Sequence, residues 1–253
     1  MLIFEGAQAR AGDPLFDDFL KRAAPLLPQS CKGEFALRFG ARAELINRAS
    51  ADAPFFLDFT SDRLLWRTAH SGRHSEAVCR AVLGKLKHPR VFDATAGLGR
   101  DALVLQCAGA QVTLFERNPA MWALLYDALK RAAACSDFIN SLPNGLPELY
   151  AFGGLTDHPE AGCCDSVYFD PMFPKRTKSA LVRRDMQVLH EAVGADEDAD
   201  AVLPQLLCRA KTRVAVKRPA GAAALCEGRI ARSGFTDGKA CRFDLYAGKA
   251  SYL

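Results

Sequence analysis

The sequence predicts an α/β fold in which a small, mostly β lobe precedes a parallel, Rossmann-like sheet. Three observations support this prediction. Apolar runs alternate with segments of helical spacing from about residue 90 onward, a glycine-rich turn joins the first of these runs to the first helix, and short apolar runs separated by turn-forming residues fill residues 1 to about 70. Strands that alternate with helices favour a parallel sheet with right-handed crossovers.

The N-terminal lobe is expected to cover residues 1–74. The runs 35–39 and 54–59 show the alternation or clustering of apolar residues that is typical of strands. Residues 14–24 predict one early helix. These patterns indicate a small α+β lobe in front of a larger domain that covers residues 75–253.

The larger domain begins with a helix predicted at 75–86, where apolar residues recur on one face. The elements after it alternate in type. The predicted strands are 90–93, 111–116, 149–152, 166–170, 213–217 and 242–246, and the predicted helices are 101–108 and 119–133. The last strand is expected to pair antiparallel at the edge of the sheet.

The composition limits the class of protein. Hydrophobic residues make up 49% of the 253 residues, which provides for a substantial buried core. No apolar run approaches the ~20 residues that span a bilayer. The first residues also lack the basic start and the long apolar stretch of a signal peptide. We therefore expect a cytoplasmic protein without a membrane partner.

Cysteines and net charge give two further expectations. The nine cysteines are scattered and form no C-x-x-C pair, which indicates reduced thiols in the core and no structural metal. The net charge is +4, from 33 basic and 29 acidic residues. This excess is too small to indicate a nucleic-acid partner by itself. Basic residues do gather at 175–178, 183–184 and 217–218.

A ligand-binding turn is predicted where the strand at 90–93 runs into the helix at 101–108. The turn reads Asp93-Ala-Thr-Ala-Gly-Leu-Gly-Arg-Asp101. Glycines let a backbone approach a ligand closely, and the N–H groups at a helix start favour a carboxylate or a phosphate. Glu116 lies about 20 residues further on, where an acid can accept hydrogen bonds from a ribose.

The turn alone leaves two cofactors open. Gly97, Gly99 and Ala102 also satisfy the G-x-G-x-x-A pattern of dinucleotide-binding proteins. A nicotinamide-dependent oxidoreductase is therefore an alternative hypothesis, although the sequence has no evident catalytic Tyr-x-x-x-Lys or His–acid arrangement. A tight turn without any ligand is the remaining possibility.

A second motif separates the two cofactors. The strand at 166–170 ends in Asp170-Pro171-Met172-Phe173, which is similar to the D/N-P-P-aromatic motif of methyltransferases that modify exocyclic amines. Oxygen acceptors on the N–H groups of such an amine localise its lone pair toward the methyl donor. Asp170 and the Pro171 carbonyl can supply two acceptors, and Phe173 can stack on the base. The two motifs together predict a class I methyltransferase that uses S-adenosylmethionine (SAM) and needs no metal.

Further motifs run in order through residues 91–248. They are Asp93-Ala-Thr-Ala-Gly-Leu-Gly-Arg-Asp101, Glu116-Arg-Asn-Pro119, Tyr168-Phe-Asp-Pro-Met-Phe-Pro174, Lys178-Ser-Ala-Leu-Val182, Val216-Lys-Arg-Pro219 and Arg242-Phe-Asp-Leu-Tyr-Ala-Gly248. With these motifs the chain resembles the small-subunit ribosomal RNA methyltransferase J family. The resemblance implies methyl transfer from SAM to the exocyclic N2 of a guanosine in 16S ribosomal RNA.

The resemblance also implies a set of cofactor contacts. They correspond to Arg100, Asp101, Glu116, Arg117, Asp170 and the pair Gly153-Gly154, and the glycine turn adds Gly97. Two of these acids have a simpler alternative role, since Asp101 can cap its helix and Glu116 can pair with Arg117. The chain departs from the family at Gly153-Gly154, where serines are common, and at 70–75, where the family has a glycine-rich stretch.

The expected partner is 16S ribosomal RNA or the small ribosomal subunit. The basic segment 175–184 follows the predicted catalytic motif directly and is expected to contact RNA phosphates, although charge runs commonly form a solvated helix face. A monomer is slightly favoured. The alternatives are methylation of another exocyclic amine, such as adenine N6 or an amine in another RNA, and RNA binding without catalysis.

Overall fold

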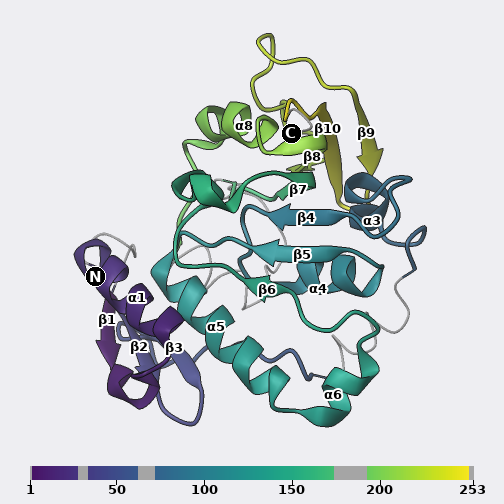
Figure 1. The fold of residues 1–253 in the computed structure, drawn as a ribbon. Helices are drawn as coiled ribbons and strands as arrows, with labels where there is room; N and C mark the ends of the chain where they lie inside the picture. The colour runs from purple at the N-terminus through teal and green to yellow at the C-terminus, as the bar shows by residue number, and fades with distance from the viewer. Residues whose placement is uncertain (1, 28–33, 62–71, 174–192, 251–253) are drawn as a thin grey trace.

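A computed structural model describes residues 2–27, 34–61, 72–173 and 193–250 (Figure 1). They form a three-stranded sheet in the order β1-β2-β3 and a seven-stranded sheet in the order β6-β5-β4-β7-β8-β10-β9. Figure 1 shows the small sheet beside one long helix, away from the yellow C-terminal end of the large sheet.

The small sheet consists of β1 (Leu2–Glu5), β2 (Phe35–Phe39) and β3 (Ala43–Asn47). β1 pairs parallel with β2, and β2 pairs antiparallel with β3. The predicted early helix is α1 (Pro14–Ala23), which begins where the Asp13 side chain accepts the N–H groups of Leu15 and Phe16. Short 3-10 turns lie at Ala7–Arg10 and Ala24–Leu26.

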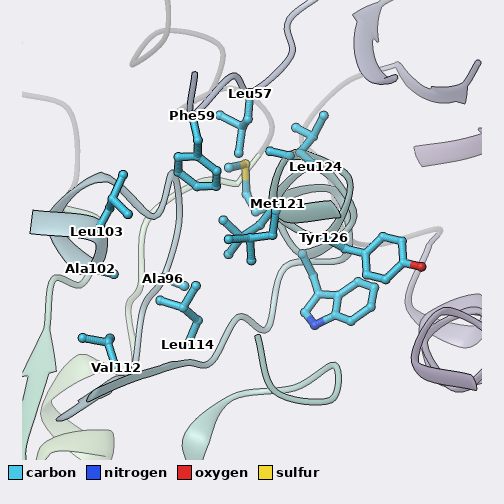
Figure 2. Packing of buried hydrophobic residues seen from close by; sticks show 14 of the residues in the cluster. Leu57, Phe59, Ala96, Ala102, Leu103, Val112, Leu114, Met121, Leu124 and Tyr126 are labelled. Carbon is cyan, nitrogen blue, oxygen red and sulfur yellow. The ribbon is translucent and has the colours of Figure 1, made fainter. Parts of the chain in front are cut away.

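The strand predicted at 54–59 is wrong, and the strands β1 and β3 were not predicted. Phe55 pairs with Leu45 at a single isolated bridge. Leu57 and Phe59 then turn into the core, where Figure 2 shows them beside Met121 and Leu124. The run is therefore apolar because it packs against a helix, and it does not form a strand.

The elements predicted in the large domain are present with ends that differ by a few residues, whereas two helices, at Ser136–Ser141 and Ala199–Leu207, and one strand, at Gly234–Asp237, were not predicted. Its strands are β4 (Arg90–Asp93), β5 (Gln111–Leu114), β6 (Glu148–Leu149), β7 (Cys164–Phe169), β8 (Ala210–Pro219), β9 (Gly234–Asp237) and β10 (Cys241–Ala247). Its helices are α3 (Ala77–Val82), α4 (Arg100–Cys107), α5 (Pro119–Ala133), α6 (Ser136–Ser141) and α8 (Ala199–Leu207), and 3-10 turns lie at Leu155–Asp157 and Pro159–Ala161.

The large sheet is parallel from β6 to β8, whereas β10 pairs antiparallel with both β8 and β9. The antiparallel pairing of β10 is confirmed, but its predicted place at the edge is wrong because β9 covers it. Alternate residues of each strand face opposite layers. Val91 and Tyr168 belong to the core that contains α3, α4 and α5, whereas Phe92 and Val167 belong to the core that contains α8.

One continuous core joins the small sheet to the large domain. Phe19 of α1 stacks on Trp122 of α5 with ring centres 4.4 Å apart, and Phe16 lies 5.2 Å from Tyr126. Arg10 also forms an ion pair of 2.9 Å with the buried Asp127. The boundary predicted between residues 74 and 75 stays a prediction, since these contacts join the two parts tightly.

Within the described ranges, every helix is too short or too polar to cross a membrane. The cysteines in those ranges are free thiols, and no group of His, Cys, Asp and Glu side chains there has the arrangement of a metal site.

Candidate active site

The predicted glycine turn connects the end of β4 to the start of α4. Gly97 and Gly99 adopt the left-handed conformation, with φ of 51° and 66°. A Cβ atom at Gly99 would lie 2.9 Å from side-chain atoms of both Leu125 and Phe59. Glycine is therefore required at position 99 by the backbone conformation and by the packing over the turn.

Glu116 lies just past β5 and holds this turn. Its Oε2 accepts the N–H of Gly97 at 2.8 Å, and its Oε1 accepts the N–H of Asn118 at 2.7 Å. Burial raises the pKa of the Glu116 carboxyl above its ordinary value, although these two hydrogen bonds oppose the shift. No ion pair between Glu116 and Arg117 is seen among the described residues.

Arg117 forms ion pairs with two other carboxylates. Its guanidinium contacts Asp196 at 2.5 Å and Asp198 at 2.6 Å, and these carboxylates raise its pKa. Asp196 also accepts the N–H of Met172 at 2.7 Å and donates its own N–H to the Met172 carbonyl at 2.9 Å. Arg117 and Asp196 therefore tie the turn after β5 to the Asp-Pro-Met-Phe motif.

A cavity of about 350 Å³, here called the cofactor cavity, lies at this edge of the sheet. Five of the predicted residues or their neighbours line it, namely Gly97, Glu116, Arg117, Asp170 and Met172. Its volume lies within the range of small-molecule sites. The buried Glu116 can accept hydrogen bonds from a ribose, and the turn at Gly97 lets a ligand approach the backbone closely. Both properties fit the nucleoside part of SAM.

The other predicted cofactor contacts do not line this cavity. Gly154 lines a small adjoining cavity of about 30 Å³. Asp101 lines a larger one of about 680 Å³, here called the second cavity. In the described part of the chain, Arg100 and Gly153 line none of these three cavities.

Asp170 and Asp101 meet at a lysine that the sequence analysis did not include in the site. Lys217 of β8 contacts the Oδ2 atom of Asp170 at 2.8 Å and the Oδ2 atom of Asp101 at 3.0 Å. Tyr168 donates its hydroxyl to the same two atoms, at 3.4 Å and 2.9 Å. The helix-capping role considered for Asp101 is wrong, because α4 is capped by Gly99 without a side chain.

Strand register explains why these side chains meet. Tyr168 of β7 pairs with Ala215 of β8, so Asp170 and Lys217 follow two residues later on the same face. Desolvation raises the pKa of Asp170, and the charge of Lys217 opposes that shift. Burial raises the pKa of Asp93, which accepts the Thr95 N–H, well above its ordinary value.

The predicted base-stacking residue is already in contact with a cation. The Arg218 guanidinium lies 3.9 Å from the centre of the half-buried Phe173 ring. Arg218 itself is held by two hydrogen bonds to the Ala223 carbonyl. One face of Phe173 is therefore covered by Arg218. Pro171 is buried beside it, whereas the basic segment 175–184 lies outside the described residues, as do residues 70 and 71.

The glycines at 153 and 154 differ in what they tolerate. Gly153 has φ of 139°, and a Cβ atom there would lie 2.8 Å from Nε2 of the buried His158. Gly154 has φ of −73°, and its added Cβ would meet its nearest neighbour, an Asp157 oxygen, at an ordinary 3.4 Å. Packing and backbone conformation therefore require glycine at position 153, whereas position 154 can accept the serine that is common in the family.

We expect Gly153→Ser to destabilise the protein and Gly154→Ser to have little effect. A strained backbone conformation of this kind costs on the order of 1–3 kcal/mol, which corresponds to a melting temperature lower by about 2–10 °C. Thermal unfolding followed by circular dichroism measures both variants. Equal melting temperatures for the two variants would contradict the packing explanation.

Comparisons with known proteins identify the family of the chain. A family model described as "Putative SAM-dependent methyltransferase" matches residues 24–248. The chain is 43% identical over 225 residues to ribosomal RNA small subunit methyltransferase J of Hahella chejuensis, which covers 87% of this chain and 82% of the relative. The chain belongs to this family. The namesake protein of Aeromonas hydrophila is 39% identical over 246 residues, or 92% of this chain and 95% of that one.

A solved structure confirms the class I methyltransferase fold. The SAM-dependent methyltransferase of Neisseria gonorrhoeae superposes with a TM-score of 0.68 at 28% identity, over 99% of this chain and 97% of the other. As a member of the J family the protein is a SAM-dependent methyltransferase. The oxidoreductase considered from the glycine turn is therefore wrong.

Proposed function

We propose that the protein transfers a methyl group from SAM to the exocyclic N2 of a guanosine in 16S ribosomal RNA, acting in the cytoplasm on the RNA or on the small ribosomal subunit. The observation that carries this proposal is the position of Asp170. Its carboxylate lines the cofactor cavity together with Gly97 and Glu116, so an oxygen acceptor for an amine lies directly beside the site for the methyl donor.

The contacts support a role for each residue of the site. Glu116 accepts hydrogen bonds from the ribose hydroxyls and holds the glycine turn in shape. Asp170 and the Pro171 carbonyl accept the N–H groups of the target amine, and Phe173 stacks on the base with its face opposite Arg218. Bound SAM supplies an electrophilic methyl group on a sulfonium, so these residues act by positioning and by electrostatics.

Arg117 has a supporting role in this proposal. Both of its partners are carboxylates, and one of them, Asp196, also holds the backbone of Met172. Arg117 lines the cofactor cavity while it fixes the loop that carries the acceptors. Its effect on the cofactor therefore comes through the shape of the cavity.

The choice of substrate rests on the family. The relatives are named as methyltransferases of small-subunit ribosomal RNA, and the resemblance of the motifs implies guanine N2 within that RNA. The site itself provides acceptors for an exocyclic amine, which adenine N6 also satisfies.

Radiolabelled SAM distinguishes these substrates. We expect the protein to label small ribosomal subunits or their RNA from a strain that lacks the enzyme, with the label in N2-methylguanosine after digestion to nucleosides. Label in N6-methyladenosine would keep the reaction class and contradict the substrate. RNA binding without any transfer of label would support the non-catalytic alternative.

A further inference from the structure

Lys217 separates two cavities at the same edge of the large sheet. Asp170 lines the cofactor cavity on one side, whereas Asp101 and Lys217 line the second cavity of about 680 Å³ on the other. The Lys217 ammonium lies between the two carboxylates, 2.8 Å from one and 3.0 Å from the other. It is less than one-third exposed, so its charge is only partly screened by water.

The contacts to Asp170 are unevenly divided between its two oxygens. Lys217 and the Tyr168 hydroxyl both bind Oδ2, and the Asp170 N–H donates to the Thr95 hydroxyl oxygen at 2.7 Å. Among the described residues, no hydrogen bond reaches Oδ1. Within the described ranges the carboxylate is thus held through Oδ2 alone.

The surroundings of the pair are rich in negative charge. Besides desolvation, the negative charge of Asp101 from α4 raises the pKa of Asp170, and Asp93 from β4 is a further acid that interacts with Asp170. The hydrogen bond that the Tyr168 hydroxyl donates to Asp170 lowers the pKa of Asp170 and so favours the ionised form. Cys241 from β10 also faces Lys217. The further charged residues that line the second cavity are Glu76, Arg80, Asp237 and Lys239.

We propose that Lys217 is a positioning residue for methyl transfer, which binds Oδ2 of Asp101 and Asp170 and so keeps Asp170 ionised and oriented toward the target amine. This inference rests on the proposed function. A carboxylate that takes up a proton becomes a poorer acceptor and presents a hydroxyl donor to an amine that needs acceptors. Lys217 disfavours protonation of Asp170 in the pH range of activity, because protonation would break the ion pair between Asp170 and Lys217.

The test compares Lys217→Met with Lys217→Arg. Loss of the cation raises the pKa of Asp170, so activity that needs the ionised form is lost at low pH and recovers as pH rises through the new pKa. We expect kcat/KM of Lys217→Met to fall by about 100-fold near neutral pH, the size of effect that a misplaced group can have. Its acid limb should move to higher pH by about one unit or more. Lys217→Arg keeps a positive charge and should keep the limb near that of the wild type.

A control removes a lysine without touching the site. Lys87 is exposed and precedes β4, at the end of the sheet opposite the carboxyl ends of the strands. Lys87→Met makes the same change in net charge, and we expect an unchanged pH profile. Calorimetric binding of SAM and thermal melting verify that each variant is folded.

Two results would overturn the inference. One is a rate of Lys217→Met that falls equally at all pH values with an unmoved acid limb, which is the behaviour of a purely structural residue. The other is wild-type activity in that variant. Nucleoside analysis of the wild-type product separates either result from a failure of the proposed function. A product other than N2-methylguanosine contradicts the proposed substrate, whereas the pH profile of Lys217→Met can still be measured with that product.

Discussion

Replacing Asp170 with alanine is expected to lower kcat by about 100- to 1000-fold, the loss typical when one preorganised electrostatic contact to the reacting group is removed. Asp170 supplies the acceptor beside the cofactor cavity, and its side chain is 36% exposed. Truncation therefore removes the acceptor without emptying a sealed core. Single-turnover transfer of labelled methyl groups to saturating RNA measures the effect.

Asp170→Asn is the matched control. Asparagine keeps a carbonyl acceptor, as in the broader D/N-P-P-aromatic motif, but loses the charge that pairs with Lys217. We expect it to keep more activity than Asp170→Ala and to lose the acid limb of the pH profile that Asp170 causes. Full activity in Asp170→Ala would show that this carboxylate does not act on the amine.

Glu116→Ala is expected to weaken SAM binding by about 10- to 150-fold, the equivalent of one hydrogen bond to a charged group at 1.5–3 kcal/mol. The Glu116 carboxylate is buried against the cofactor cavity and holds the N–H groups of Gly97 and Asn118. Its loss removes the ribose acceptor and leaves the glycine turn without its support. Isothermal titration calorimetry with SAM measures the change.

Glu148→Ala is the corresponding control, because Glu148 is an exposed acid on β6, the strand next to β5. We expect it to bind SAM as the wild type does. A dissociation constant of Glu116→Ala equal to that of the control, in a variant that still folds, would contradict the role of Glu116 at the ribose.

Motifs at the ends of strands could be predicted from the sequence because parallel strands end at one edge of a sheet. This rule brings Gly97, Glu116 and Asp170 to one cavity, as observed. The partners of those residues depend on long-range pairing, which periodicity does not encode. Asp196, which binds Arg117, lies 79 residues away in the chain.

Lys217 shows what further signal was available. Tyr168 and Asp170 are two residues apart and so lie on one face of their strand. Only the register of β7 against β8 shows that Lys217 lies beside Asp170 on that face. The helix α8 was not predicted, and it contains Pro204, a residue that normally ends a helical pattern. The edge strand β9 exposes Phe235 and lacks a clear buried face.

The aromatic stack between α1 and α5 affects the order in which the chain can fold during its synthesis. Phe16 and Phe19 contact Phe39 and Phe4 of the small sheet, which is complete at Asn47, but their partners Tyr126 and Trp122 lie on α5, which ends at Ala133. At roughly 5–20 residues per second, the ribosome needs several seconds to bridge that interval. During this time Phe16 and Phe19 lack the two rings of α5 that they contact in the finished fold. The small sheet and α1 therefore complete their packing only after α5 has been synthesised, so the N-terminal part and the large domain reach their final structure together.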